Sequence, residues 1–221
     1  MQATFGENIS LLEELKKSLS IPRFQTYRTL AKNDDMRAVE LYQWNAKLGQ
    51  SLYIYLQGWE IRLRSKLNGF LVWKYIANWP YDERAPRQMN ASDRRRLQEA
   101  RQRQEMQRSV QAAPTSAIVA DLSAGFWVSQ LSGSYRIPYV WRHNLPRVFP
   151  HDRVLDAKDA WAICNDLLIL RNRVAHHEPI LQLPLDRRMR DLKRVVAAMC
   201  PATQAYCEAS CSFDAVWRAR P

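Results

Sequence analysis

A single apolar stripe at helical spacing runs through residues 35–78 and constrains the fold more than any other feature of the chain. Its large side chains recur every three or four positions, which places them along one side of an α-helix. They are Leu48, Leu52, Tyr55, Trp59, Leu63, Leu67 and Phe70. Polar residues at 33–35 provide an N-terminal capping signal, and Pro80 ends the tract because proline disfavours helix in the residue before it. We therefore predict one long helix on which the rest of the chain packs.

Helical patterns also dominate outside this tract. Only 6 of the 221 residues are glycine, so the glycine-dependent turns of β-rich proteins are scarce. Amphipathic spacing, capping residues and prolines predict further helices at about 8–19, 22–31, 92–109, 122–131 and 156–177. Two or three more are expected within about 186–218, with Pro201 between them. Ser92 and Asp156 are the expected N-caps of two of them. The sequence thus predicts an all-α fold, with residues 1–221 forming one helical domain.

The chain carries a formal net charge of +11, which attracts polyanions through phosphate contacts and counterion release. Nucleic acid is the favoured partner on this ground, and an acidic membrane or an acidic protein is the alternative. No apolar run reaches the roughly 18 residues that a membrane helix needs. Residues 1–7 lack the basic-then-apolar layout of a signal peptide. We expect a cytoplasmic protein without membrane attachment.

The four cysteines do not form a recognisable metal site. Cys207 and Cys211 lie four positions apart, which could place both on one helix face, but no histidine lies nearby to complete a ligand set. We expect free thiols, Cys164 and Cys200 included, with no bound metal and no cofactor.

Residues 81–116 form a distinct basic segment with few apolar positions. A helix this polar packs weakly, so we expect it to be mobile or stabilised by a partner. Four of its arginines, together with Arg173, are predicted to contact an RNA backbone, and the alternative is an ordinary solvated face. The four are Arg94, Arg95, Arg96 and Arg101. The aromatic residues near 135–141 could stack on bases or belong to the core; they are Tyr135, Tyr139 and Trp141.

The predicted helix at 156–177 ends in a cluster of cationic and titratable side chains, because residues 171–177 read Arg-Asn-Arg-Val-Ala-His-His. Cleavage of RNA without metal needs a base for the ribose 2′-OH, an acid for the leaving 5′ oxygen, and a cation for the charge that develops at phosphorus. Histidine suits both proton transfers, and arginine forms two-pronged contacts with phosphate. Arg171, Asn172, His176 and His177 are therefore candidate catalytic residues.

A structural role explains the same residues. The arginines could pair with nearby acids, and the histidines could cap carbonyl groups at the helix C-terminus. Asn172 and His176 share a face of an ideal helix, whereas Arg171 and His176 are about 140° apart on it. A joint site therefore requires the long arginine side chain, a helix end near His176, or a second copy of the chain with its motif helix antiparallel.

Glu60 and Arg64 lie four positions apart, in the order that suits an ion pair along one helix. Stabilisation of that helix is one interpretation of the pair. The other is that these residues support the cluster at 171–177, with the carboxylate of Glu60 orienting a motif arginine or histidine.

The string Arg171-Asn172-x-x-x-His176 resembles the R-[NDH]-x-x-x-H form of the Rx4–6H signature of HEPN domains. More specifically, the chain is similar to the bacterial Abi-like family of abortive-infection proteins, of the AbiD/AbiF type. That similarity rests on four blocks that follow one another in the expected order over most of the chain. The blocks are residues 37–46, 56–64, 125–128 and 170–179.

This resemblance implies a HEPN-like helical bundle with additional helices, which dimerises with its motif helices facing each other. It also implies metal-independent RNA cleavage in phage defence or in a toxin–antitoxin system. Arg171 and His176 would be the catalytic pair, Asn172 the polar residue after the arginine, and His177 an alternative for the key histidine. The implied partners are RNA, a second copy of the chain, and a cognate RNA or protein antitoxin. The alternative function is a non-catalytic protein that holds a small or regulatory RNA in a defence complex.

Overall fold

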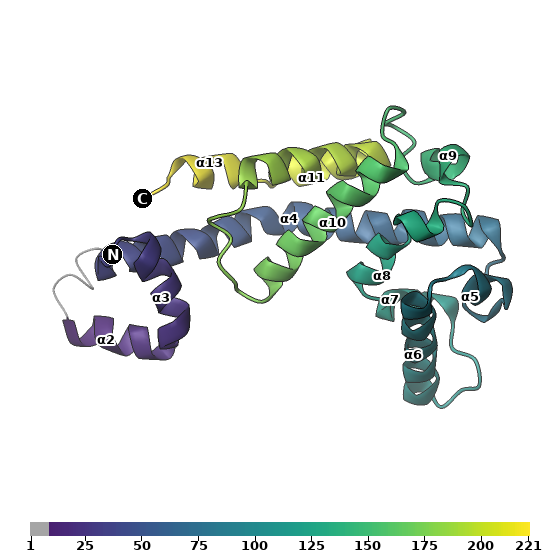
Figure 1. Cartoon of the computed structure of the whole chain (residues 1–221), viewed down its shortest axis with the longest axis horizontal. Helices are drawn as coiled ribbons and strands as arrows, with labels where there is room; N and C mark the ends of the chain where they lie inside the picture. The colour runs from purple at the N-terminus through teal and green to yellow at the C-terminus, as the bar shows by residue number, and fades with distance from the viewer. Residues whose placement is uncertain (1–8) are drawn as a thin grey trace. The chain divides into compact units, whose positions relative to one another are not determined.

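The computed structural model describes residues 9–221, so the expectation about a signal peptide concerns residues that lie outside the described range. Within that range the chain forms α-helices and short 3₁₀ helices without any β-strand, which confirms the predicted all-α class. Figure 1 shows the α-helices in chain order: α2 (Ile9–Ser18), α3 (Ile21–Leu30), α4 (Asp35–Lys74), α5 (Arg84–Gln88), α6 (Ala91–Arg108), α7 (Thr115–Asp121), α8 (Ala124–Ser129), α9 (Trp141–Asn144), α10 (Ala157–Ala175), α11 (Leu185–Met199), α12 (Pro201–Ala209) and α13 (Phe213–Arg218). The 3₁₀ helices are η1 (Trp79–Tyr81), η2 (Gly133–Tyr135) and η3 (Leu145–Arg147).

The long helix α4 is the predicted one. All seven members of its apolar stripe are at most 2% exposed, which confirms the pattern that the sequence shows. The helix ends at Lys74, four residues earlier than expected. Trp79 and Pro80 instead enter the 3₁₀ helix η1, where proline is tolerated in the first turn. None of the helices formed by residues 9–221 is long and apolar enough to cross a membrane.

By its internal contacts the chain divides into two compact units, and the expectation of one helical domain stays a prediction. Of the described residues, unit 1 contains 9–54, 173–185 and 211–221, and unit 2 contains 55–172 and 186–210. The division falls within α4, after Ile54, and within α10, after Asn172. The apolar stripe of α4 runs through this division, from Leu48 in unit 1 to Phe70 in unit 2.

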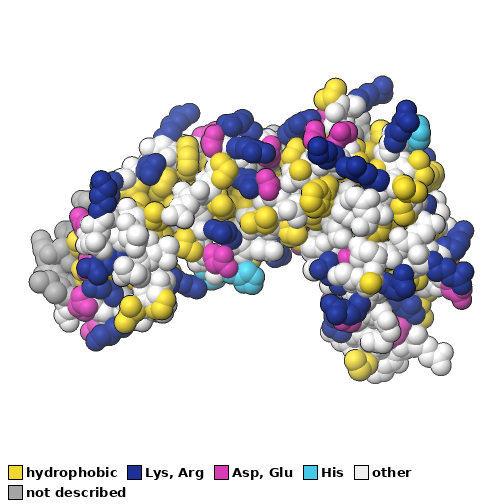
Figure 2. Space-filling model, in the orientation of Figure 1, with side chains coloured by type: hydrophobic (Ala, Val, Ile, Leu, Met, Phe, Trp, Pro, Cys, Tyr) yellow, Lys and Arg dark blue, Asp and Glu magenta, His cyan; other side chains and the backbone are white. Residues whose placement is uncertain are grey.

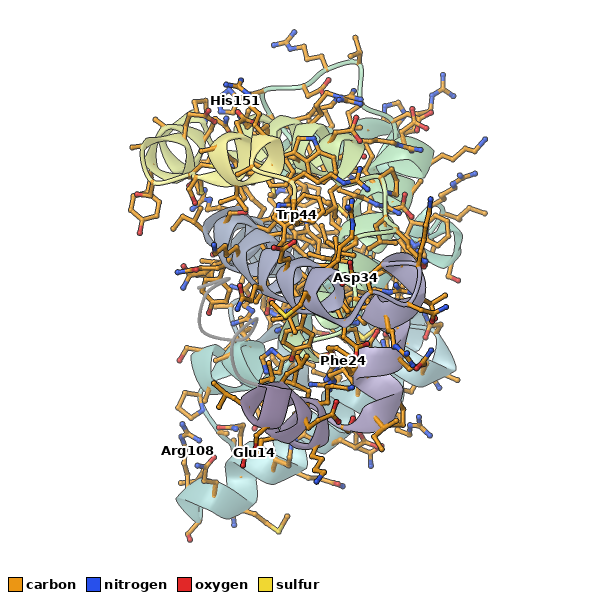
Figure 3. All side chains as sticks on the ribbon, turned by 90° about the vertical axis from the view of Figure 1, so that its left-hand side faces the viewer. Glu14, Phe24, Asp34, Trp44, Arg108 and His151 are labelled. Atoms are coloured by element: carbon orange, nitrogen blue, oxygen red, sulfur yellow. The ribbon has the colours of Figure 1, made fainter. Side chains whose placement is uncertain are left out.

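In unit 1, the first half of α4 packs with α2, α3 and α13. Trp44 of α4, labelled in Figure 3, is 4% exposed. Its indole Nε1 donates a hydrogen bond of 2.9 Å to the Val216 carbonyl, and its ring stacks on Trp217 at 5.6 Å between centroids. At the start of α4, Asp35 accepts ion pairs from Lys16 at 2.8 Å and from Arg28 at 2.8 Å. These contacts join segments that are distant in the sequence into one core.

In unit 2, the second half of α4 is covered by aromatic side chains and by α12. Phe70 lies 4.6 Å from Trp141 and 5.2 Å from Tyr139, measured between ring centroids. On α4, Gly58 allows close approach to α12, because a Cβ added there would lie 2.7 Å from Cys207 Sγ. The second half of α4 is therefore a buried support for the helices around it.

Candidate functional site

Arg171 and Asn172 lie near the C-terminal end of α10, in unit 2. The helix begins directly after Asp156, whose Oδ1 accepts a hydrogen bond of 2.8 Å from the Asp159 backbone N–H, so the predicted N-cap is confirmed. Its buried side is formed by Ala160, Cys164, Leu167 and Leu170. This buried stripe fixes the rotation of α10 and leaves Asn172 exposed and Arg171 half-buried at the edge of the core.

The carboxylate of Glu60 lies between two arginines. Its Oε2 accepts a hydrogen bond of 2.9 Å from Arg171 Nε, and its Oε1 accepts one of 3.1 Å from Arg64 Nη2. The Glu60 side chain is only 18% exposed and that of Arg171 is 37% exposed. Arg171 Nη1 also donates to Asn172 Oδ1 at 3.4 Å. Glu60 thus makes both contacts considered from the sequence, the pair within α4 and the contact with the motif arginine.

The backbone after Arg173 turns in a C-terminal capping motif built on a histidine. His177 N–H donates to the Val174 carbonyl at 3.2 Å and Glu178 N–H to the Arg173 carbonyl at 2.8 Å, which is the Schellman pattern. His177 occupies the left-handed position of this motif, with φ of 55°, where glycine is usual. His176 is the residue just after α10 and is exposed. The expected helix end at His177 therefore lies two residues further on than the observed one.

A buried asparagine anchors the chain that follows the histidines. Asn45 of α4 is 8% exposed, its Oδ1 accepts from Ile180 N–H at 2.8 Å, and its Nδ2 donates to the Glu178 carbonyl at 3.4 Å. Arg173 Nη1 also donates to the Pro179 carbonyl at 3.2 Å. Asn45 was not a predicted site residue. Its polarity on the packed side of α4, directly after Trp44, is the sequence signal that could have identified it.

The four arginines that we predicted to contact RNA from the basic segment each have a partner in unit 2. Arg94 donates to the carbonyl groups of Pro86 and Met89, at 3.1 and 3.2 Å. Arg101 lies 4.2 Å above the Tyr81 ring, measured from Cζ to the centroid. Arg95 pairs with Glu99 at 3.6 Å and Arg96 with Asp93 at 3.1 Å. All of these partners lie within residues 81–105, away from Glu60 in the sequence.

Asp93 joins α6 to the core of unit 2. The carboxylate is fully buried, and its Oδ2 accepts hydrogen bonds from Ser129 at 2.6 Å and from the Tyr135 hydroxyl at 2.7 Å. The N-cap of α6 is Asn90, whose Oδ1 accepts from Asp93 N–H at 2.9 Å, so the prediction of Ser92 as the cap was wrong. Asn90 replaces Ser92 because the helix begins at Ala91, one residue before the serine.

The aromatic residues near 135–141 belong to the core. Tyr135 and Tyr139 are 0% exposed and Trp141 is 1% exposed, so of the two roles considered from the sequence, stacking on bases is wrong. Tyr139 OH donates to Gln130 Oε1 at 2.8 Å, and Trp141 Nε1 donates to the Gln130 carbonyl at 2.9 Å. Burial raises the pKa of the Tyr139 hydroxyl well above its usual range. These polar atoms are satisfied inside the protein and are not available to a ligand.

In the part of the chain that the structure describes, no three His, Cys, Asp or Glu side chains gather closely enough to hold a metal ion. None of the four cysteines forms a disulfide. Comparisons of the chain with protein-family models, with curated proteins and with solved structures gave no match.

Unit 2 brings together four of the predicted site residues, which are Arg171, Asn172, Glu60 and Arg64. Unit 1 contains Arg173, His176 and His177.

Proposed function

We propose that this chain is a metal-independent endoribonuclease of the HEPN type that acts in phage defence or in a toxin–antitoxin system. The observation that carries the proposal is the contact of Arg171 with Glu60, at 2.9 Å, five positions before an exposed histidine. An arginine that only solvates a helix end does not need a mostly buried carboxylate from another helix. Held by its Nε, Arg171 keeps a fixed position while its side chain remains 37% exposed to a ligand.

The proposed reaction uses few groups. His176 accepts the proton of a ribose 2′-OH, and the 2′ oxygen attacks the adjacent phosphorus. Arg171 stabilises the negative charge that develops on the phosphoryl oxygens. The bond from phosphorus to the 5′ oxygen breaks, a protonated histidine supplies the proton to that oxygen, and the products are a 2′,3′-cyclic phosphate and a 5′-hydroxyl. Asn172, exposed next to Arg171, orients the phosphate.

We further propose that the active protein is a homodimer with its motif helices facing each other. The step just described needs one histidine as base and one as acid, and two copies of the chain supply two His176 side chains at a two-fold axis. The half-exposed side chains of Trp161 (39%) and Ile169 (44%) on α10 provide apolar area for such an interface. The proposed fold of the dimer is a HEPN-like bundle with additional helices.

The test is incubation of the purified protein with total RNA in EDTA, with mapping of the ends. We expect cyclic phosphate ends, and loss of cleavage in His176→Ala and in Arg171→Ala, with circular dichroism unchanged. Cleavage that requires Mg²⁺, or that survives both substitutions, contradicts the proposal. RNA that co-purifies and binds tightly without turnover supports the alternative of a non-catalytic RNA-holding protein.

His177→Gly is the matched control for the neighbouring histidine. Glycine fits the left-handed position that His177 occupies, so this variant should be more stable by about 1 kcal/mol. Full cleavage by His177→Gly leaves His176 as the key histidine, whereas loss of cleavage assigns the chemistry to His177. Toxicity of the chain on expression, relieved by a co-expressed neighbouring RNA or protein, tests the toxin–antitoxin part of the proposal.

A further inference from the structure

Two segments of unit 2 carry basic residues and no acidic ones. Residues 61–81, in the second half of α4 and η1, contain no Asp or Glu, and neither do residues 122–151. The packing of Phe70 on Tyr139 and Trp141 brings these two segments side by side. Each of the four acids that border these segments along the chain is already paired. The pairs are Glu60 with Arg64 and Arg171, Asp82 with Arg84, Asp121 with Arg103, and Asp152 with Arg194. The two segments therefore carry their positive charge without an acidic residue of their own.

An arginine of one segment stacks on an exposed tryptophan of the other. The Arg147 guanidinium lies 3.6 Å above the Trp73 ring, measured from Cζ to the centroid. Trp73 is nevertheless 52% exposed, whereas Trp59, Trp79, Trp127 and Trp141 are at most 1% exposed. The Trp73 ring is exposed to solvent and lies against a guanidinium, whereas the core aromatic residues of the same unit are buried. The ring offers a surface on which a planar group could stack, and the guanidinium beside it offers N–H donors to an anion.

Further cations lie on the same two segments. Lys74 lies 5.8 Å above the Tyr139 ring, next to Trp73 in the chain. Arg136 and Arg142 are exposed, and neither they nor Arg147 form an ion pair or a side-chain hydrogen bond with another residue of the range 9–221. We call Trp73, Lys74, Arg136, Arg142 and Arg147 the Trp73 platform. In Figure 2, Lys and Arg side chains lie beside hydrophobic ones over the part of the molecule that contains α9.

The contrast with α6 locates the available positive charge. The arginines of α6 that we predicted to bind RNA are engaged by carbonyl groups, by acids or by Tyr81. Those of the Trp73 platform are exposed and have no acidic partner among the described residues. Because phosphate contacts depend on cations that are free to replace counterions, the platform is the better polyanion surface of unit 2.

We propose that the Trp73 platform binds single-stranded RNA, with a base stacked on Trp73 and the flanking arginines on phosphates. Single strands expose the faces of their bases, and proteins bind them by combining aromatic platforms with a cationic groove. An A-form duplex keeps its base faces covered and offers nothing to Trp73. An acidic membrane fits less well, because insertion of Trp73 would carry the stacked guanidinium of Arg147 into the apolar phase. This inference rests on the proposed function, since it gives the ribonuclease a surface for its substrate strand.

The probe is a 20-nucleotide, mixed-sequence, fluorescent 2′-O-methyl RNA, which cannot be cleaved because it has no free 2′-OH. Fluorescence anisotropy on the full chain measures Kd at several salt concentrations. Trp73→Ala should raise Kd by about 5- to 100-fold, as expected for loss of one stacking aromatic residue. Tyr206→Ala is the matched control, because Tyr206 is 62% exposed on α12 and should leave Kd unchanged.

A pair of double variants compares the two basic surfaces at equal charge. Arg142→Ala with Arg147→Ala should lower the slope of log K against log salt by about 1.4, since each phosphate contact to a single strand contributes about 0.7. Arg95→Ala with Arg103→Ala, on α6, removes the same charge and should change the slope much less. All four side chains are exposed, so melting temperatures should stay close to that of the parent protein.

The inference is overturned if Trp73→Ala binds like Tyr206→Ala, if the α6 variant has the larger effect, or if the matching duplex binds as tightly as the single strand. Binding of phosphatidylserine vesicles in place of the oligonucleotide also overturns it and assigns the platform to a membrane. The proposed function is tested separately from the platform. If the probe binds in a Trp73-dependent way but total RNA is not cleaved, the ribonuclease proposal is rejected and the platform is retained. Cleavage of total RNA that is unchanged in Trp73→Ala retains the ribonuclease and removes the platform.

Discussion

Replacement of Gly58 by alanine tests the packing of α4 on α12 most directly. In a helix interior, alanine is favoured over glycine by about 1 kcal/mol. At Gly58, however, the added methyl group would lie 2.7 Å from Cys207 Sγ and 3.5 Å from Thr203 Cγ2. Cys207 is fully buried, so its sulfur can move only by displacing its neighbours, and overpacking of this kind costs about 1–3 kcal/mol. The net expectation is a loss of about 0–2 kcal/mol in the free energy of unfolding.

Gly69 supplies the matched control in the same helix. A Cβ added there meets no atom within 4 Å, so Gly69→Ala should gain about 1 kcal/mol from helix propensity alone. Urea denaturation followed by circular dichroism measures both variants, which should shift the midpoint in opposite directions without changing the slope. Cys207→Ala combined with Gly58→Ala removes the clash and should be more stable than the sum of the single effects. Equal stabilisation by both glycine substitutions, or strict additivity in the double variant, would refute the close packing of α4 on α12.

Three further outcomes follow from single contacts. Glu60→Gln should lower kcat for RNA cleavage by about 10- to 100-fold with little change in KM, because Arg171 loses its carboxylate; an unchanged kcat removes Glu60 from the site. Asn45→Leu should destabilise the protein by about 1–3 kcal/mol in thermal unfolding, because Ile180 N–H loses its buried acceptor; a neutral effect shows that the segment is anchored otherwise. Burial raises the pKa of Tyr27 to about 12, and its hydroxyl has no hydrogen-bond partner among residues 9–221. Because a tyrosine of the unfolded chain titrates near pH 10, the free energy of unfolding falls as the pH rises from about 10 to 12. Tyr27→Phe should therefore match the parent at pH 7 and lose less stability between pH 10 and 12, whereas identical alkaline profiles contradict the assigned pKa.

Local periodicity and local capping chemistry were readable from the sequence. The stripe from Leu48 to Phe70 predicted α4, and Asp156 predicted the start of α10, because both signals act between residues a few positions apart. Where two nearby residues were equally good N-cap candidates, the prediction failed. Ser92 and Asn90 are both good N-caps, and only the packing of Asp93 into the core of unit 2 selected Asn90.

The sequence by itself determined the all-α class, the long helix, and the placing of Arg171 and His176 within five positions at the end of α10. Tertiary structure alone decided that Glu60, 111 positions away, contacts Arg171. It also decided that the α6 arginines have partners while Arg147 stacks on an exposed Trp73. The physical reason is that charge and aromatic character are properties of a residue, whereas burial and pairing depend on which distant segments pack together. Composition therefore indicates how much positive charge the chain carries, and only the fold shows which part of it is free to bind.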